Sequence, residues 1–355
     1  LETTVGPRGP LLDDTERSAA VMRFPGPIID EAQLDWILSQ ERFRTARIDT
    51  RFEVAGGPEA MAAALQRIED EAAAAVRGGA GLVLLSDRGV DDAHAAVPIL
   101  LATGAAHHRL IRDGLRTRSA LILETAEPRE DHHYACLVGY GAALIHPYLA
   151  LATCREVPDL VRRDDPLGPD AAVRNYVSAV EQGLLKIMSK MGISAISSYR
   201  AAQIFEAIGL DEGLIERCFR GTPCHLGGAD LEQLASDVLR LHAEAYGEHS
   251  ALVDRGIYRF RKRGEYHAFN PQVFKALHKA VREEDAEAYA RYAELVDGRP
   301  PTAVRDLLEP VALGAPVGID EVEPVDSLVR RFTTQAMSHG SVSRETHETL
   351  AIAMN

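Results

Sequence analysis

The stretch Gly81-Leu82-Val83-Leu84-Leu85-Ser86 is the part of this sequence that decides the fold. It is a short, continuous apolar run, and Gly78-Gly79 separates it from an alanine-rich segment that begins near Gly57. A run of this length between glycines and polar residues is typical of a strand that is buried on both faces, as in a parallel sheet. We therefore expect a buried strand over residues 81–86, preceded by a helix over residues 57–77.

The same pattern repeats along the chain. Apolar runs predict further strands over residues 119–124, 142–147 and 193–199. Helices are expected over residues 98–112, 131–141, 171–191, 230–246, 271–281 and 285–296. Short buried strands that alternate with helices indicate βα units and a parallel sheet. The predicted fold class is therefore α/β, with the βα units forming a partial or TIM-like barrel.

Changes in composition divide the chain into parts. Residues 1–50 carry prolines and glycines and are expected to form an extended segment, with a short helix over residues 31–40, that packs on the following domain. Residues 51–300 form the predicted central domain. A break at Gly298-Arg299-Pro300-Pro301 introduces a linker over residues 301–323, and residues 324–355 begin another domain.

The charge balance bears on the class of partner. The chain has 39 Lys and Arg against 53 Asp and Glu, a net charge of −14. An acidic surface repels phosphate backbones, so we expect no nucleic-acid partner. The apolar runs are too short to span a bilayer and no signal peptide is seen, so we expect a cytoplasmic protein with no membrane contact.

The cysteines and histidines offer little for a metal site. The four cysteines form no CxxC pair, so we expect buried free thiols with no metal or cluster: Cys136, Cys154, Cys218 and Cys224. The pairs His107-His108 and His132-His133 consist of adjacent residues, which point about 100° apart on a helix. We expect structural roles for them. A metallohydrolase that uses His107, His108, His132 and Glu124 stays open as an alternative.

Two segments could contact a ligand. Residues 124–131, rich in acidic side chains, follow a predicted strand, and ligands of parallel sheets bind at the carboxyl ends of strands. A solvated loop is the competing interpretation. In the second segment, a strand-like lead over residues 328–333 precedes the small and hydroxyl residues up to Ser341, and Ser343 is a plausible N-cap for the helix that follows. Backbone N–H groups there could hold the edge of a flavin or an organic anion.

The chain resembles the large subunit of glutamate synthase. The resemblance rests on short motifs that are spread over most of the sequence. They include Leu85-Ser86-Asp87-Arg88, Ala106-His107-His108-Arg109, Gly139-Tyr140-Gly141-Ala142, Pro147-Tyr148-Leu149-Ala150, Ser189-Lys190-Met191-Gly192, Gln203-Ile204-Phe205-Glu206, Ala336-Met337-Ser338 and His347-Glu348-Thr349-Leu350. It identifies residues 51–300 as the central domain and residues 324–355 as the first βα element of a second (β/α)8 barrel, the flavin-binding synthase domain.

The resemblance implies a function for the whole enzyme. Glutamine is hydrolysed in an amidotransferase domain, ammonia passes through a tunnel, and 2-oxoglutarate is aminated and reduced by FMN to glutamate. It implies that Ala336, Met337 and Ser338 lie at the FMN, and that Met337, Ser338, Gly340 and Ser341 lie at the 2-oxoglutarate. No residue of the chain matches a catalytic nucleophile or acid/base of the family. The parent enzyme also holds an iron–sulfur cluster.

Several expectations concern the role of the chain itself. It begins with Leu1 and stops within a predicted helix at Asn355, a pattern expected of an interior piece of a larger protein. We expect it to connect the amidotransferase and flavin domains, to line the ammonia tunnel, and to bind no cofactor and catalyse nothing alone. A reducing subunit or ferredoxin serves the parent enzyme, and a homo-oligomer stays open. The competing interpretation is a scaffold module without a ligand.

Overall fold

The computed structural model describes residues 1–8, 20–160, 167–247, 254–335, 337–338 and 340–355. The chain divides into two compact units, Leu1–Ala251 and Leu252–Asn355, which we call unit 1 and unit 2 and describe separately. This division falls inside the predicted central domain of residues 51–300. The predicted boundaries at residues 50, 300 and 323 stay predictions.

Unit 1 is built from short strands and longer helices. Its strands are β1 (Thr3–Val5), β2 (Met22–Phe24), β3 (Thr45–Asp49), β4 (Arg51–Glu53), β5 (Leu82–Ser86), β6 (His94–Ala96), β7 (Ala120–Glu124) and β8 (Ala142–His146). Its α-helices are α1 (Glu31–Leu38), α2 (Gly57–Arg77), α3 (Ile99–Arg112), α4 (Asp131–Gly139), α5 (Tyr148–Leu160), α6 (Pro169–Met191), α7 (Ile196–Tyr199), α8 (Glu212–Cys218) and α9 (Leu231–Ala245). The strands at residues 81–86, 119–124 and 142–147 and the helices predicted in this unit are confirmed.

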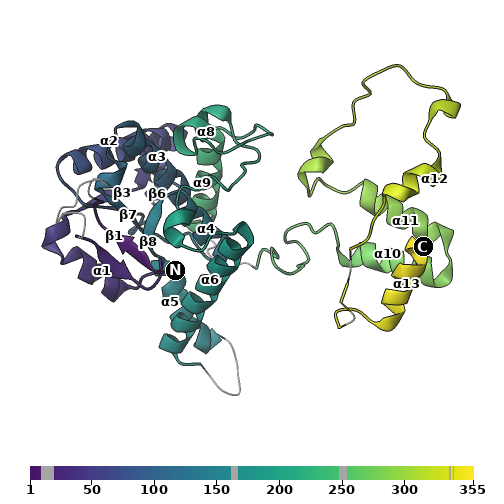
Figure 1. Cartoon of the computed structure of the whole chain (residues 1–355), viewed down its shortest axis with the longest axis horizontal. Helices are drawn as coiled ribbons and strands as arrows, with labels where there is room; N and C mark the ends of the chain where they lie inside the picture. Colours follow the sequence, from purple (N-terminus) through teal and green to yellow (C-terminus); the bar gives the residue numbers. More distant parts are fainter. Residues whose placement is uncertain (9–19, 161–166, 248–253, 336, 339) are drawn as a thin grey trace. The chain divides into compact units, whose positions relative to one another are not determined.

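A parallel sheet in the order β3-β5-β7-β8 organises unit 1. Within this sheet each strand lies beside the next one along the chain, while β4 and β6 pair with each other in a separate two-stranded sheet. Because right-handed crossovers then all return on the same side, α2, α3 and α4 cover one face of the sheet, while α1 and β1 lie on the other (Figure 1). This strand order is that of a (β/α) barrel, so the described part of unit 1 confirms the predicted partial barrel.

The two faces of the sheet explain the continuous apolar runs. Val83 and Leu85 point into the main core, where they pack with α2 and α3. Leu82 and Leu84 point into a second core with residues of β1, β2 and α1. A strand covered on both sides needs apolar residues at every position, which is the pattern that identifies β5 and β7 in the sequence.

The predicted strand at residues 193–199 is wrong. Gly192 ends α6 in the left-handed conformation at φ 70°, and the short helix α7 follows. Its Ile196 and Tyr199 are both buried against the main core. Their spacing of three residues is that of a helix face, and two inward-pointing residues out of four do not require a strand.

The opening segment contributes more to unit 1 than the sequence suggests. β3 (Thr45–Asp49) pairs with β5 in parallel register, and β1 pairs with β2 in antiparallel register. β3 is an edge strand that alternates apolar and charged residues, Ala46 and Ile48 with Arg47 and Asp49. Such a strand lacks the continuous apolar run by which the central strands are recognised.

Unit 2 is helical in its described part. Its helices are α10 (Pro271–Glu283), α11 (Ala286–Asp297), α12 (Val325–Leu328) and α13 (Arg344–Met354), with 3₁₀ turns at Val304–Leu307, Ile319–Glu321 and Val329–Arg331. α10, α11 and α13 confirm the predicted helices, and the Ser343 hydroxyl accepts a hydrogen bond from the Thr346 backbone N–H at 3.3 Å as the expected N-cap. The predicted strand over residues 328–333 is wrong, because α12 and the turn Val329–Arg331 occupy most of it.

Large apolar side chains of unit 2 are exposed. Leu313 is fully accessible, and Leu307, Val311, Ile319, Phe332 and Ile352 are all more than 70% exposed. Scattered single apolar residues are normal on protein surfaces, but this number in about fifty residues exceeds that pattern. None of the helices in the described ranges has the length and hydropathy needed to cross a bilayer.

Candidate functional site

Polar residues line the carboxyl edge of the parallel sheet in unit 1. The strand register aligns Asp49 with Ser86, Ser86 with Glu124, and Glu124 with His146. Each of the four ends its strand, and ligands of α/β sheets bind beyond this edge. We name the group formed by the last three of these strand ends and the residues around them the carboxyl-edge cluster; it comprises Glu31, Arg47, Ser86, Asp87, Arg88, Glu124, Thr125, His146 and Tyr148.

Glu124 lies at the centre of the cluster and is only 2% exposed. Its carboxylate accepts hydrogen bonds from Ser86 Oγ at 2.5 Å, Arg47 Nη2 at 2.6 Å and Arg88 Nε at 2.6 Å. Arg88 also donates through Nη2 to Glu31 on α1 at 2.6 Å. Three strands are therefore joined through a single buried carboxylate, and Arg88 links that carboxylate to α1.

Asp87 forms a second layer behind Glu124. Its carboxylate accepts a hydrogen bond from Thr125 Oγ1 at 2.5 Å and another from the backbone N–H of Ala126 at 3.1 Å. The hydroxyl of Tyr148, at the start of α5, also hydrogen-bonds to Asp87. The guanidinium carbon of Arg88 lies 4.6 Å from the centre of the Tyr148 ring, a cation–π contact.

Burial and partners set the protonation of the cluster. Burial raises the pKa of Glu124, but the hydrogen bonds from Ser86 and Arg88 and the charge of Arg47 outweigh it, so the net shift is downward and Glu124 is ionised. Burial raises the pKa of Asp87. Burial also lowers the pKa of His146, against the opposing effect of Glu31 and Glu124, so its ring is neutral at pH 7.

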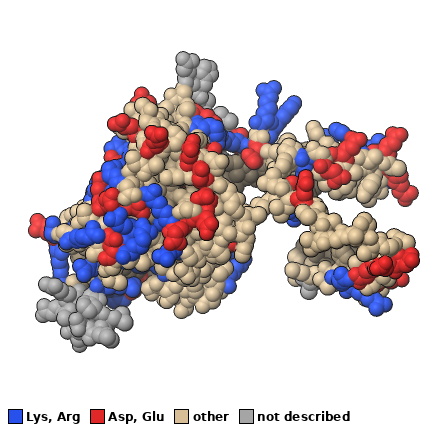
Figure 2. Space-filling model, turned by 90° about the horizontal axis from the view of Figure 1, so that it is seen from above, with Lys and Arg blue, Asp and Glu red and all other residues tan. Residues whose placement is uncertain are grey.

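Most charged groups of the carboxyl-edge cluster form ion pairs within the cluster. Glu124 and Glu31 are each paired with an arginine, while Asp87 is bonded to neutral partners. His146 Nδ1 lies 3.9 Å from Glu124 Oε1, too far for a hydrogen bond. A general base or nucleophile must have an atom within reach of a substrate. The carboxylates of this cluster are instead bonded to neighbouring side chains, and these bonds hold the strand ends together. Figure 2 shows acidic and basic side chains interleaved on the visible face in the same way, without a large patch of one sign.

The predicted flavin and 2-oxoglutarate residues lie in unit 2, in the loop before α13. Ala336 lies outside the described residues. Met337, Ser338, Gly340 and Ser341 are exposed. The Ser338 carbonyl accepts hydrogen bonds from the backbone N–H of Ser341 at 3.0 Å and from its Oγ at 2.8 Å. A Cβ built on Gly340 would meet no atom within 4 Å, so the packing of the described residues does not require glycine there.

The histidines of the alternative metal site are not brought together with Glu124. Arg116 donates to His107 Nδ1 at 2.8 Å and to the carbonyls of Ser119 and Gly141, which precede β7 and β8. His107 is therefore at the amino edge of the sheet, while Glu124 ends β7 at the carboxyl edge. Five strand residues span roughly 13 Å, too far for a shared ion. Among the described residues, no three His, Cys, Asp or Glu side chains form a group that could hold a metal.

The acidic loop over residues 124–131 is used by the fold. Glu124 belongs to the carboxyl-edge cluster, and the exposed Glu127 accepts a hydrogen bond from the backbone N–H of Ile99 at 3.0 Å, which caps the start of α3. Asp131 begins α4. The four cysteines are free, but only Cys218 is buried; Cys136, Cys154 and Cys224 are intermediate, so the expectation of buried thiols is wrong for three of them.

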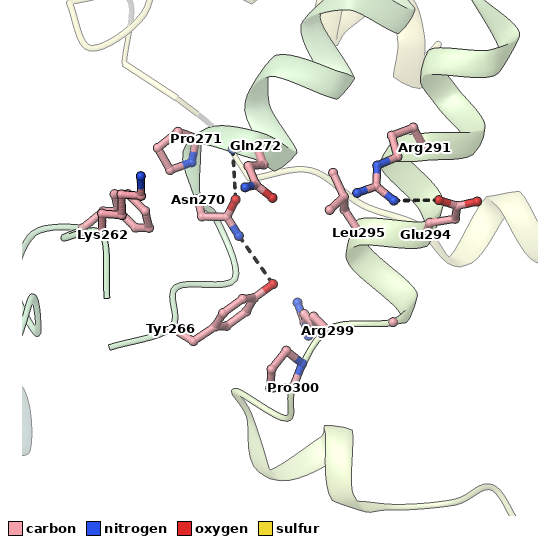
Figure 3. Close-up of a pocket in the computed structure, with 12 residues that line it drawn as sticks. Lys262, Tyr266, Asn270, Pro271, Gln272, Arg291, Glu294, Leu295, Arg299 and Pro300 are labelled. Atoms are coloured by element: carbon pink, nitrogen blue, oxygen red, sulfur yellow. Dashed lines mark hydrogen bonds and ion pairs between the residues drawn. The ribbon is translucent and has the colours of Figure 1, made fainter. Parts of the chain in front are cut away.

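A surface pocket of about 570 Å³ lies in unit 2 where α10 begins and α11 ends. Figure 3 shows Asn270 at its centre, with Tyr266 pointing toward it. Asn270 Oδ1 accepts from the backbone N–H of Gln272 at 3.0 Å, and its Nδ2 lies 3.4 Å from the Tyr266 hydroxyl. Arg291 is paired with Glu294 at 2.8 Å. These polar groups cap a helix or pair with one another, which accounts for their positions.

Sequence reasoning overlooked most of the carboxyl-edge cluster. Four of its residues belong to motifs that support the family resemblance, but they were not predicted as site residues: Ser86, Asp87, Arg88 and Tyr148. The usable signal is that each is within two residues of the end of a parallel strand. Arg47 had no such signal, because its strand was not predicted.

Comparison with known proteins gives matches over both units. Residues 1–211 match the family model of the glutamate synthase central domain, and residues 267–355 match that of the conserved region in glutamate synthase. Among curated relatives, the ferredoxin-dependent glutamate synthase of Pyropia yezoensis is 41% identical over 367 residues, which is 100% of this chain and 24% of that protein. The NADPH glutamate synthase large chains of Azospirillum brasilense and Bacillus subtilis are 41% and 39% identical.

The chain spans about a quarter of the length of these curated relatives: 24% for Pyropia and 23% for Azospirillum. Among solved structures, a flavocytochrome b2 variant with sulfite bound matches with a TM-score of 0.30 and 15% identity, covering 38% of this chain and 32% of that one.

Proposed function

Because this chain belongs to the glutamate synthase family, we propose that it is the central domain and the start of the flavin-binding domain of an enzyme that makes glutamate from glutamine and 2-oxoglutarate. The observation that supports this most strongly is the order of the matches, with one family model on unit 1 and the second on unit 2, and relatives that align over the whole chain. The enzyme works in the cytoplasm, and either a reducing subunit or ferredoxin supplies its electrons.

Within that enzyme, unit 1 connects the amidotransferase site to the synthase site and lines the path of ammonia. The ionic network at its carboxyl edge supports a structural role, because Glu124 and Glu31 are paired with Arg47 and Arg88. A connecting domain must hold two sites at a fixed spacing, since a misplacement of about 1 Å costs up to 10²-fold in rate. A network that joins three strands to α1 provides that rigidity.

Unit 2 contributes one edge of the flavin site. Ala336, Met337 and Ser338 would lie at FMN, and Met337, Ser338, Gly340 and Ser341 would lie at 2-oxoglutarate. When bound, FMN supplies the hydride chemistry. The residues fit this role, because the loop is exposed and Gly340 leaves room for a ligand to approach the backbone. The exposed apolar side chains of residues 304–355 suit a surface that further protein covers.

The chain by itself has no turnover and retains no FMN. The iron–sulfur cluster belongs to another part of the parent enzyme. Purified chain should therefore be colourless and should release no glutamate from glutamine and 2-oxoglutarate in the presence of a reductant. Stoichiometric flavin absorbance on the purified chain would contradict this part of the proposal.

A chimera tests the connecting role. The matching stretch of the Azospirillum brasilense large chain is replaced by these 355 residues, and glutamate formation is measured with glutamine and, separately, with ammonia. We expect both nitrogen sources to support synthesis with dithionite-reduced methyl viologen. A chimera that contains FMN and uses ammonia but not glutamine would contradict the ammonia path, and one that contains FMN and uses neither would contradict the assignment of unit 2.

A further inference from the structure

A cavity of about 170 Å³ lies at the amino edge of the sheet in unit 1, opposite the carboxyl-edge cluster. Its wall includes Ser119 and Gly141, which precede β7 and β8, and His107 from α3. Three arginines complete it: Arg8 after β1, Arg116 in the turn before β7, and Arg200 after α7. We call this space the arginine cavity.

The positive charge of the arginine cavity is not neutralised by the described residues. Arg116 donates to two backbone carbonyls and to His107 Nδ1, and Arg200 Nη2 donates to the Thr3 hydroxyl. In the described ranges, no Asp or Glu forms an ion pair with Arg8, Arg116 or Arg200. By contrast, Arg47 and Arg88 in the carboxyl-edge cluster are each paired with the carboxylate of Glu124.

Burial and mutual repulsion act on these arginines. Burial, together with the charges of Arg200 and Arg8, lowers the pKa of Arg116 to about 10, and burial with the charge of Arg8 lowers the pKa of Arg200 to about 10. Both remain protonated at pH 7. Burial lowers the pKa of His107 to about 3, so the ring is neutral and Nδ1 can accept from Arg116. The cavity therefore holds three like charges beside a neutral imidazole.

Two buried polar atoms of the residues that line the cavity have no hydrogen-bond partner among the residues that the structure describes. They are Oγ of Ser119, a residue only 3% exposed, and Nε of Arg200. An unpartnered buried polar group costs about 1–3 kcal/mol, and most such groups in native structures are bonded to something. Both atoms are almost inaccessible, so the side chain must rotate before either atom can donate to an oxygen in the cavity.

We propose that the arginine cavity binds a small, doubly charged oxyanion, either a phosphate or a short dicarboxylate. Guanidinium groups recognise both through paired N–H···O hydrogen bonds. Arg116 and Arg200 would donate to the anion's oxygens through the guanidinium N–H groups that bond to no described residue, and the exposed Arg8 would add charge. The proposal does not depend on the function proposed above, because the cavity lies in unit 1 and uses none of the flavin-loop residues.

Binding is tested on the whole chain by isothermal titration calorimetry and thermal melting. Sodium phosphate and sodium succinate are the two probes, with sodium chloride at equal ionic strength as the reference. We expect phosphate, succinate or both to raise the melting temperature beyond chloride. A response to phosphate alone identifies a phosphate site, and a response to succinate alone identifies a dicarboxylate site. The proposal is overturned if the melting temperatures in phosphate and in succinate both equal the melting temperature in chloride.

Three variants place the binding in the cavity. Arg200→Gln should weaken binding at least tenfold. Arg200→Lys keeps the positive charge but lacks the paired N–H groups of the guanidinium, and it should weaken binding less. Arg118→Gln is the matched control, since Arg118 is exposed on the same turn as Arg116 and does not line the cavity. Circular dichroism checks that each variant is folded. Equal affinity in folded Arg200→Gln and Arg118→Gln would overturn the proposal.

Discussion

Arg88 Nε donates a hydrogen bond to Glu124 Oε1 at 2.6 Å, which ties the loop after β5 to the last residue of β7. The two residues are 36 positions apart, and the parallel register of β5 and β7 places their strand ends side by side. Glu124 is almost fully buried, whereas the Arg88 side chain is 38% exposed. The two ends of the pair are therefore unequal: the arginine can be solvated if the pair breaks, but the carboxylate cannot.

This inequality predicts the effect of substitution. Glu124→Gln removes the negative charge shared by Arg47 and Arg88 and replaces one of the two acceptor oxygens with an NH2 group that faces a donor, which should cost about 2–3 kcal/mol of unfolding free energy. Arg47→Gln should cost less, roughly 1 kcal/mol, because Arg88 and Ser86 still bind the carboxylate. Urea denaturation followed by circular dichroism measures both.

Arg23→Gln is the control for this series. The Arg23–Glu2 pair is more than half exposed on both sides, so its loss should change the unfolding free energy by less than about 1 kcal/mol. If Glu124→Gln were no more destabilising than Arg23→Gln, the carboxyl-edge cluster would not be holding the strand ends together.

The parallel sheet could be predicted because β5, β7 and β8 are covered on both faces. A continuous apolar run in the sequence then indicates a buried strand. The helices between these strands are bounded by glycine, proline and capping residues. β3 is an edge strand with Arg47 and Asp49 on one side, and its sequence resembles a loop. Residues 193–199 were wrongly predicted as a strand because apolar residues also occur on short helices that pack against a core.

The carboxyl-edge cluster could be predicted only in part. Glu124 was singled out because it follows an apolar run, but its partners come from β3, the end of β5 and the loop after β5. Which of these meet depends on strand register, and register is set by packing between segments that are distant in the sequence. The arginine cavity has the same origin, because Arg8, Arg116 and Arg200 belong to three separate segments.

The buried ring of His107 predicts a dependence of stability on pH. Above pH 6.5 His107 is neutral in both the folded and unfolded chain and contributes no slope. Between pH 6.5 and about 3 the unfolded chain binds a proton that the folded chain does not, so stability falls as the pH falls. The slope from this one group is up to about 1.4 kcal/mol per pH unit.

His107→Gln removes this contribution while an amide oxygen can still accept from Arg116. The difference in unfolding free energy between wild type and His107→Gln should therefore shrink or change sign as the pH is lowered from 7 to 5. Urea melts at three or four pH values measure it. His108 and His146 also have lowered pKa values, so only the difference between the two proteins reports on His107. Parallel curves would contradict the prediction.

Gly104 on α3 predicts a packing effect. A Cβ on Gly104 would lie 2.2 Å from the backbone oxygen of Cys218, which is at the end of α8. Alanine gains about 1 kcal/mol in helix propensity, but the overlap with a backbone atom costs more, so Gly104→Ala should be net destabilising by roughly 1–2 kcal/mol. Gly227→Ala is the control, since its Cβ would meet nothing within 4 Å. Thermal melting distinguishes them, and equal melting temperatures would show that α3 and α8 can separate without cost.

The exposed apolar residues of unit 2 predict self-association. The double variant Leu313→Ser, Ile319→Ser should bind less of the dye ANS and form fewer aggregates in light scattering than wild type, because both side chains are more than 80% exposed. Leu149→Ser is the control, a half-exposed apolar residue of unit 1. If all three proteins bound ANS equally, the apolar surface of residues 304–355 would not be available in solution.

Gly340 separates the requirements of the chain from those of the proposed enzyme. In the 355-residue chain, Gly340→Ala should change the unfolding free energy by less than about 0.5 kcal/mol, because its Cβ would meet no atom. In the chimera, where the proposal places FMN and 2-oxoglutarate beside this loop, the added methyl should raise the KM for 2-oxoglutarate or lower FMN content about tenfold. Gly314→Ala, which is equally open, is the matched control and should leave both proteins unchanged. A Gly340→Ala chimera as active as the Gly314→Ala chimera would show that no ligand approaches this backbone, and the assignment of Met337, Ser338, Gly340 and Ser341 would be wrong.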